Sequence, residues 1–168
     1  MRTLLLACLC SAAAGLQLPA QSASVSFYGT GCAYQGLNLA IGVQGLPQLG
    51  TTFTITYSGP NFNSTLMIQP ALALGLLPDN LPIPPAILPL QPAGCSVWIV
   101  PALIQTMLPT ATGLFATSVD IGVPNNPGLI GFTVFAQWFA TVVQCGIIPP
   151  CTFDALPTSD GALLVVGT

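Results

Sequence analysis

The sequence predicts an all-β protein, an antiparallel β-sandwich of about eight strands with a long proline-rich loop. Seventeen glycines and seventeen prolines divide the chain into short apolar runs at intervals typical of strands. Residues 52–57 alternate between threonine and a large apolar side chain, which is the pattern of a strand with one buried face. The sequence contains neither glutamate nor lysine, so it lacks the charged residues that form the solvent face of most surface helices.

The N-terminus has the pattern of a secretory signal peptide over residues 1–23. Arg2 supplies the positive charge, residues 4–14 are mostly leucine and alanine, and small residues before position 24 offer cleavage sites. A lipoprotein leader ending at Cys8 is the weaker alternative, because too few apolar residues precede that cysteine. We therefore expect a single secreted β-domain over residues 24–168.

Seven further segments are predicted strands because they are apolar or alternating and are bounded by turn residues. In chain order they are 24–28, 37–43, 66–74, 96–103, 113–121, 132–143 and 162–166. In the strand 52–57, Phe53, Ile55 and Tyr57 are expected on the buried face.

The uncharged segment 128–143 has to be weighed as a membrane span. It is shorter than the roughly 20 apolar residues that a spanning helix needs, and Thr133, Gln137 and Thr141 would form a polar stripe on such a helix. As a strand, its even-numbered positions 132–142 form one wholly apolar face. The sequence therefore predicts a strand here and no membrane span in the mature chain.

Residues 70–94 contain seven prolines among leucine, isoleucine and alanine. Proline fixes φ and cannot donate to a strand ladder, so this segment is not expected to be a central strand. We expect an extended, polyproline-like loop across one end or edge of the sheets, with its Leu and Ile side chains covering apolar surface. A proline-rich recognition motif or a lid over a pocket is the less favoured alternative.

Two further stretches are predicted turns. Pro124-Asn125-Asn126-Pro127 combines asparagines that suit turns with a proline that cannot extend a ladder. Asp160-Gly161 is predicted to form a tight hairpin turn with its carboxylate in solvent.

Four cysteines follow the predicted signal peptide, and an even number is typical of disulfide bonding in an exported domain. Cys145 and Cys151 flank a short proline-containing turn that could bring them into bonding range, which leaves Cys32 to pair with Cys95. Neither close Cys-x-x-Cys pairs nor histidines are present, so a zinc site and a redox-active pair are disfavoured.

Several short motifs resemble those of the uncharacterised secreted β-sandwich-like domains that are abundant in planctomycete-type bacteria. The motifs lie at residues 28–32, 45–50, 92–95, 124–131 and 136–138, with a short strand before Gly167. The resemblance covers most of residues 24–168 and implies export, a β-sandwich-like fold, a Cys32–Cys95 bridge and no enzymatic activity.

The charge content excludes most catalysis. After the predicted signal peptide the only charged side chains are Asp79, Asp120, Asp154 and Asp160, and the chain has no histidine. A serine nucleophile would have no general base, and Asp154 with Asp160, both in turn-like stretches, is not a recognisable carboxylate pair. Asp79-Asn80 offers too few oxygens for calcium. We therefore expect no enzyme activity, no cofactor and no metal.

The same composition limits the partners. Nucleic acid is excluded because nothing is available to neutralise phosphate, so a partner should be neutral, such as a polysaccharide, another secreted β-domain or a second copy. Trp98 and Trp138 are candidates for stacking on a sugar, although core packing is the favoured role for both. The predicted function is a non-catalytic secreted structural or interaction module of the cell envelope or extracellular space, with a lectin-like carbohydrate-binding module as the alternative.

Overall fold

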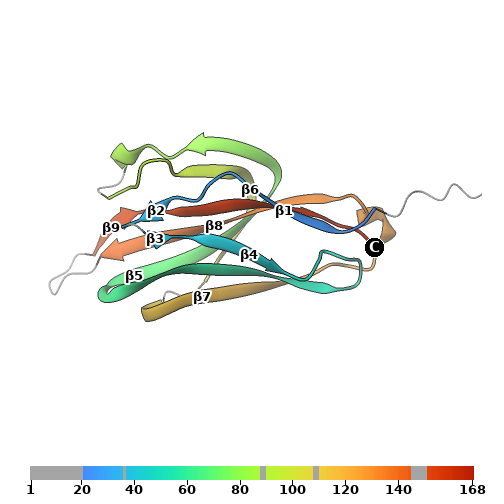
Figure 1. Cartoon of the computed structure of the whole chain (residues 1–168), viewed down its shortest axis with the longest axis horizontal. Helices are drawn as coiled ribbons and strands as arrows, with labels where there is room; N and C mark the ends of the chain where they lie inside the picture. Colours follow the sequence, from blue (N-terminus) through green and yellow to red (C-terminus); the bar gives the residue numbers. More distant parts are fainter. Residues whose placement is uncertain (1–20, 36, 88–89, 108–109, 145–150) are drawn as a thin grey trace, which may run out of the picture.

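The computed structural model describes residues 21–35, 37–87, 90–107, 110–144 and 151–168. These residues form ten β-strands and two short 3-10 turns, and the first and last strands pair with each other (Figure 1). The strands are β1 (Ser24–Tyr28), β2 (Ala33–Tyr34), β3 (Leu37–Asn38), β4 (Ala40–Gln44), β5 (Thr52–Pro82), β6 (Ser96–Thr106), β7 (Thr110–Gly122), β8 (Thr133–Gln144), β9 (Thr152–Ala155) and β10 (Thr158–Val165). The all-β prediction is confirmed, and within these ranges no helix is long and apolar enough to cross a membrane.

Strand β5 is 31 residues long and belongs to both layers of the fold. Its first part pairs with β4 on one side and β7 on the other, both antiparallel. Its later part, from Leu66 to Gly75, pairs with β8, which continues through β10 to β1. The bend in β5 therefore converts one hydrogen-bonded sheet into two layers, and the predicted strands 52–57 and 66–74 are two parts of one strand.

The core lies between these two layers. Phe53, Ile55 and Tyr57 of β5 are buried, as their alternation predicts. From the facing layer Trp138 packs against Tyr57, with ring centroids 5.4 Å apart, and its indole N–H donates to the Thr56 carbonyl at 3.1 Å. The aromatic pair thus has its one indole donor satisfied by the opposite layer.

The buried apolar face predicted for β8 is also confirmed. Ala136, Trp138, Ala140 and Val142 are all buried in the core. The neighbouring face carries Gln137, which is fully buried as well, so part of that face is covered by another segment of the chain.

The prediction that residues 70–94 avoid the central strands is wrong for residues 70–82. Pro70 is buried within β5 opposite Ala140 of β8. The Pro70 carbonyl accepts from Met107 N at 2.9 Å, and Ala140 N donates to the Pro157 carbonyl at 3.0 Å. Pro70 and Ala140 therefore form a non-hydrogen-bonded pair of the antiparallel ladder. Because no hydrogen bond joins the two residues, the N–H that proline lacks is not needed between β5 and β8.

Beyond Pro82 the prediction of a loop packed on its own domain is confirmed. Gln91 is buried, donates from Nε2 to the Leu156 carbonyl at 3.2 Å and accepts from Leu156 N at 2.8 Å. Leu90 N donates to the Asp154 carbonyl at 3.0 Å. The Gln91 side chain and one backbone hydrogen bond therefore fasten the loop to β9 and to the chain that follows it.

Of the two predicted turns, one is confirmed and one is wrong. Asn126 caps the 3-10 turn Pro127–Leu129 by accepting from Gly128 N at 3.0 Å. Asp160 and Gly161 instead lie inside β10, at an irregularity in its register with β8. Asp-Gly suits such a bulge as well as it suits a hairpin turn. Asp160 Oδ1 there accepts from Ile41 N at 3.3 Å, linking β10 to β4.

The end of β5 and strand β6 form a hairpin, residues 75–82 with 96–106, that we call the arm. It is the upper green-to-yellow part of Figure 1. Register irregularities between Leu74 and Leu81 bend the arm, and Gly75 pairs with both Phe135 of β8 and Pro101 of β6. A Cβ atom at Gly75 would collide with the Val100 carbonyl oxygen. Glycine is therefore required for the close approach at the base of the arm.

Gly75→Ala should lower the free energy of unfolding by about 2 kcal/mol, because backbone atoms cannot move aside as a flexible side chain can. Urea denaturation with the disulfides intact measures the loss. Gly122→Ala is the matched control, since the nearest atom to its Cβ, Thr52 Oγ1, is 4.0 Å away. Equal stability of the two variants would contradict the tight packing at Gly75.

Candidate functional site

The Cys32–Cys95 disulfide anchors the start of β6. Its sulfur atoms are 2.01 Å apart and the Cα atoms 4.9 Å apart, which confirms the predicted pairing. Closing a loop between residues separated by 63 positions restricts the unfolded chain by about 4 kcal/mol in the entropic account. Cys151 is also disulfide-bonded, whereas Cys145 lies outside the described residues, so their pairing with each other stays a prediction.

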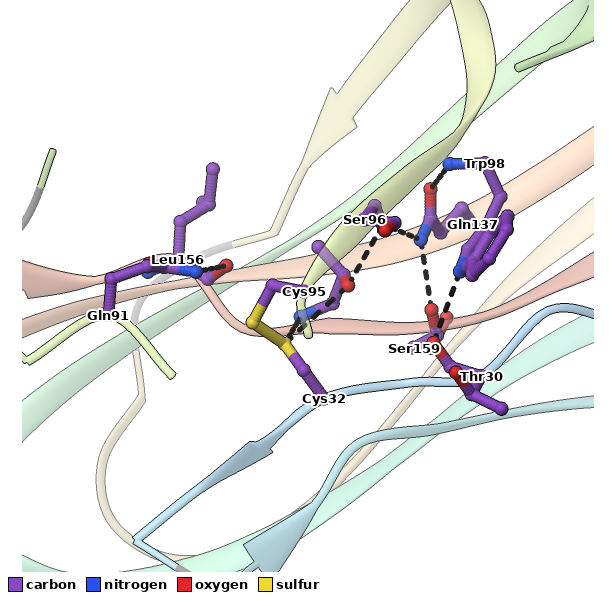
Figure 2. Close-up of a disulfide and its surroundings, with 10 residues drawn as sticks. Thr30, Cys32, Gln91, Cys95, Ser96, Trp98, Gln137, Leu156 and Ser159 are labelled. Carbon is purple, nitrogen blue, oxygen red and sulfur yellow. Dashed lines mark hydrogen bonds between the residues drawn. A yellow bond between two sulfur atoms is a disulfide. The ribbon is translucent and has the colours of Figure 1, made fainter. Parts of the chain in front are cut away.

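Next to this disulfide, the side chain of Gln137 joins three strands (Figure 2). Its Oε1 accepts from Trp98 N at 2.8 Å. Its Nε2 donates to the carbonyls of Ser96 and Ser159, at 3.0 and 2.9 Å. The amide of β8 thereby satisfies backbone groups of β6 and β10, and we call this arrangement the Gln137 junction.

Thr158 connects the disulfide to the junction. Its backbone N–H donates to Cys32 Sγ at 3.2 Å, and its hydroxyl donates to the Ser96 carbonyl at 3.1 Å. Cys32 N in turn donates to the Thr158 carbonyl at 2.8 Å. Because Cys32, Ser96, Thr158 and Gln137 are all buried, these groups hold the arm in place and are not available to a ligand.

The two tryptophans predicted as possible stacking residues have different environments. Trp138 is 0% exposed, so core packing is confirmed for it and it cannot stack on a sugar. Trp98 is half-buried in β6, and its indole N–H donates to the Thr30 carbonyl at 3.1 Å. Gly29 lies against its ring, and Tyr28 meets it edge-on with centroids 6.4 Å apart. Much of the indole is thus already in contact with the protein.

The four carboxylates are spread over different strands and bond to neighbouring groups. Asp120 of β7 accepts from the Thr54 hydroxyl at 2.7 Å, and Asp79 accepts from Asn80 N at 2.8 Å. Asp154, expected in a turn, instead lies buried in β9 and accepts from the Thr152 hydroxyl at 3.0 Å. In the described part of the chain no three acidic or cysteine side chains gather into a group that could hold a metal ion.

The tyrosines are shielded from water. Desolvation raises the pKa of Tyr28 to about 12, and it also raises the pKa of Tyr57 and of Tyr34, the latter with a contribution from the negative charge of Asp154. Among the described residues the buried Tyr57 hydroxyl has no hydrogen-bond partner. An ionised phenolate at that position would lack both water and a donor, which is why burial favours the neutral form.

The arm carries the most exposed apolar surface among the described strands. Its large, exposed side chains are Leu76, Leu77, Leu81, Val100, Leu103 and Ile104, each between 46% and 61% exposed. The expectation that leucines of the proline-rich segment cover apolar surface is therefore wrong for Leu76, Leu77 and Leu81. The segment 81–119 contains no charged residue, and this is the sequence signal that could have drawn attention to the arm.

Comparison of the chain with protein-family models, with curated proteins and with solved structures found no match. The interpretation of the arm therefore depends on its geometry, burial and charge.

Gln137→Leu should lower the free energy of unfolding by about 3 kcal/mol, because it leaves the Trp98 N–H and the Ser96 and Ser159 carbonyls without their partner in a buried site. Gln44→Leu, at an exposed position of β4, is the matched control and should change stability by less than about 0.5 kcal/mol. Urea denaturation distinguishes the two. A Gln137→Leu protein as stable as the control would show that the junction contributes little.

Alkaline titration should produce tyrosinate absorbance only above the ordinary tyrosine pKa of 10.0, since the pKa of all three tyrosines is raised. The folded state holds these protons more tightly than the unfolded state does. The resulting stability is therefore complete below pH 10.0 and is lost as the pH rises through about 12, the pKa of Tyr28. Ultraviolet absorbance follows ionisation, and circular dichroism follows unfolding. A tyrosinate midpoint at 10.0 in the folded protein would contradict this burial.

Proposed function

We propose that the protein is a non-catalytic, exported structural module that acts by contact through the arm, and that its partner at this surface is a second copy of the same chain. The observation that carries the proposal is the exposure of β6: every residue from Val100 to Thr106 is exposed. Among the described strands, β6 has β5 as its only ladder partner. Side chains of Gln137, Thr158 and Tyr28 occupy the outer edge of β6 at Ser96 and Trp98, so the part that could accept another strand is residues 100–106.

The exposed apolar side chains support a contact role. Leu77 lies directly opposite Val100 within the arm, and Leu103 lies opposite Leu74, the residue of β5 that precedes the arm, so apolar groups are adjacent across β5 and β6. At about 25 cal/mol per Å² of apolar surface, covering such side chains is the main source of affinity in protein association. Large exposed apolar patches of this kind commonly mark interaction sites.

The charge of the arm favours a copy of the same chain. Asp79 is its only charged residue, and the described residues offer no cation to any partner. Apart from Asp79 the arm is uncharged and apolar, so the electrostatic cost when two arms meet is limited to the screened repulsion between two solvent-exposed carboxylates. Two β6 edges can pair antiparallel about a two-fold axis, which gives a closed, isologous dimer.

Export is the second part of the proposal. The basic and apolar N-terminus supports it, and so does the Cys32–Cys95 disulfide, because structural disulfides persist mainly in oxidising compartments. One oxygen of each of the four carboxylates accepts a hydrogen bond from a neighbouring group, which supports a role without catalysis, although the buried Asp154 Oδ2 has no partner among the described residues.

Carbohydrate binding is the second candidate function, and the half-buried Trp98 is the observation in its favour. Tyr28 contacts both Trp98 and Phe135 edge-on, so three aromatic rings lie together. Aromatic rings of this kind stack on sugars when one face is open. The contact of Gly29 with the indole reduces that open area, and for this reason self-association is the preferred function.

The leading proposal predicts a concentration-dependent dimer of the exported protein in sedimentation velocity. The double variant Leu77→Ser, Leu103→Ser should be monomeric at concentrations at which the wild type is dimeric, because it removes apolar surface from the arm. Leu46→Ser is the matched control, since Leu46 is also exposed, at 45%, but lies outside the arm. It should dimerise as the wild type does.

A wild type that remains monomeric at every concentration would contradict the proposal. The same samples should also be run in native gels that contain neutral polysaccharides. Retardation of the wild type that is abolished by Trp98→Phe would favour the carbohydrate-binding candidate instead.

A further inference from the structure

An apolar cavity opens between the two layers at the end of the sandwich where the 3-10 turn Pro127–Leu129 lies. Its volume is about 190 Å³. Residues of both layers line it, namely Phe53 and Ile121 from one layer and Leu74, Val134 and Leu164 from the other, with Phe132 and Leu129 beside them. It is separate from the buried Gln137 junction, none of whose residues lines it.

The chemistry of the cavity wall is uniform. All of its lining residues are glycine, proline, valine, leucine, isoleucine or phenylalanine, so no side chain offers a hydrogen bond or a charge to the contents. Water against this wall finds few polar partners, and apolar cavities of comparable volume, about 150 Å³, take up benzene or xenon in proteins. The cavity is therefore suited to an apolar guest.

Its mouth has the same character. Phe132 is 44% exposed, and Leu74, Ile121, Leu129 and Val134 are half-buried, so apolar groups continue from the interior to the surface. Leu74 lies opposite the exposed Leu103 of β6, which extends the apolar path along the flank of the fold. An elongated apolar group could contact this path beyond the cavity.

We propose that this cavity binds a small, uncharged, apolar molecule or the apolar end of a larger neutral one, with an aromatic ring or a short alkyl chain as the group inside. The size follows from the volume, and the chemistry follows from the wall. The ligand is neutral because residues 21–168 contain no lysine, arginine or histidine to hold an anionic head group. The wall also provides no carboxylate for a cationic one. This binding site is independent of dimerisation through the arm.

The test uses the exported protein with benzene, hexan-1-ol and sodium hexanoate as probes, and it measures thermal unfolding at increasing probe concentration. A ligand that binds only the folded state raises the midpoint in proportion to the logarithm of its concentration above Kd. Benzene and hexan-1-ol should raise the midpoint in this way, and each should bind saturably in calorimetric titration. Hexanoate, which has the same chain length with a charge, should bind at least about 10-fold more weakly, because its carboxylate finds no partner.

Variants locate the site. Ile121→Phe and Val134→Phe each place extra volume at a half-buried position of the wall, and each should weaken benzene binding at least about 10-fold. Two filling variants are used so that failure of one to fold leaves the other to decide. Leu77→Ser, in the arm but outside the cavity wall, is the matched control and should bind benzene as the wild type does.

Three results would overturn the proposal. They are the absence of saturable benzene binding, equal binding by the wild type and both filling variants, and loss of binding in Leu77→Ser, which would place the guest on the arm. If benzene binding is absent and intact mass shows residues 1–20 still attached, the first of these results points to the N-terminal segment as the occupant.

Discussion

The side-chain amide of Gln137 accepts one hydrogen bond and donates two in a site that solvent does not reach. A buried backbone group without a partner costs free energy, and here three such groups from β6 and β10 meet one amide of β8. β6 forms a ladder with β5 only, and the junction explains how the start of β6 is nevertheless held close to β8 and β10. With the Cys32–Cys95 disulfide beside it, the junction fixes the start of β6 (Figure 2). The position of the exposed surface of the arm depends on this attachment.

The scarcity of charged residues determines which side chains can form hydrogen bonds with buried backbone groups. In the described residues no cation is available to neutralise a buried carboxylate, so amides and hydroxyls bond to the buried backbone groups at the junction, whereas Asp154 Oδ2 and the Tyr57 hydroxyl have no hydrogen-bond partner. Gln91 joins the proline-rich loop to Leu156 in the way that Gln137 joins β6 to its neighbours. Neutral amides carry a smaller desolvation cost than ions do, which suits a small apolar domain.

The same scarcity shapes the surface. Apolar side chains gather at the surface in the arm and at the mouth of the cavity between the layers, and neither place has a basic residue near it. The two places differ in form, because the arm presents a strand edge with side chains around it and the cavity is a hollow open on one side. An edge suits another strand, whereas an apolar hollow suits a small molecule. For this reason we propose macromolecular contact for the arm and ligand binding for the cavity.

The sequence by itself determined the features that depend on neighbours along the chain. Alternation placed Phe53, Ile55 and Tyr57 in the core and gave β8 its apolar face, and turn chemistry located the cap at Asn126. Export and the absence of catalysis remain predictions from composition. Of the candidate site, the sequence analysis predicted the Cys32–Cys95 pair, whereas the arm was not predicted although the uncharged stretch that includes β6 is visible in the sequence.

Only the tertiary structure decided the features that depend on what lies across the sheet. Pro70 fits a central strand because its carbonyl and the Ala140 N–H bond in other directions, and Asp160 extends β10 because Ile41 N needs an acceptor. The local sequence pattern could not show that β5 bends and belongs to both layers, nor that Gly75 lets β6 approach β5 closely. It also could not show that the leucines of the arm stay exposed. Side-chain alternation reports which face of a strand is apolar. It does not report which strand, loop or solvent that face will meet, because partners distant in sequence are chosen by packing.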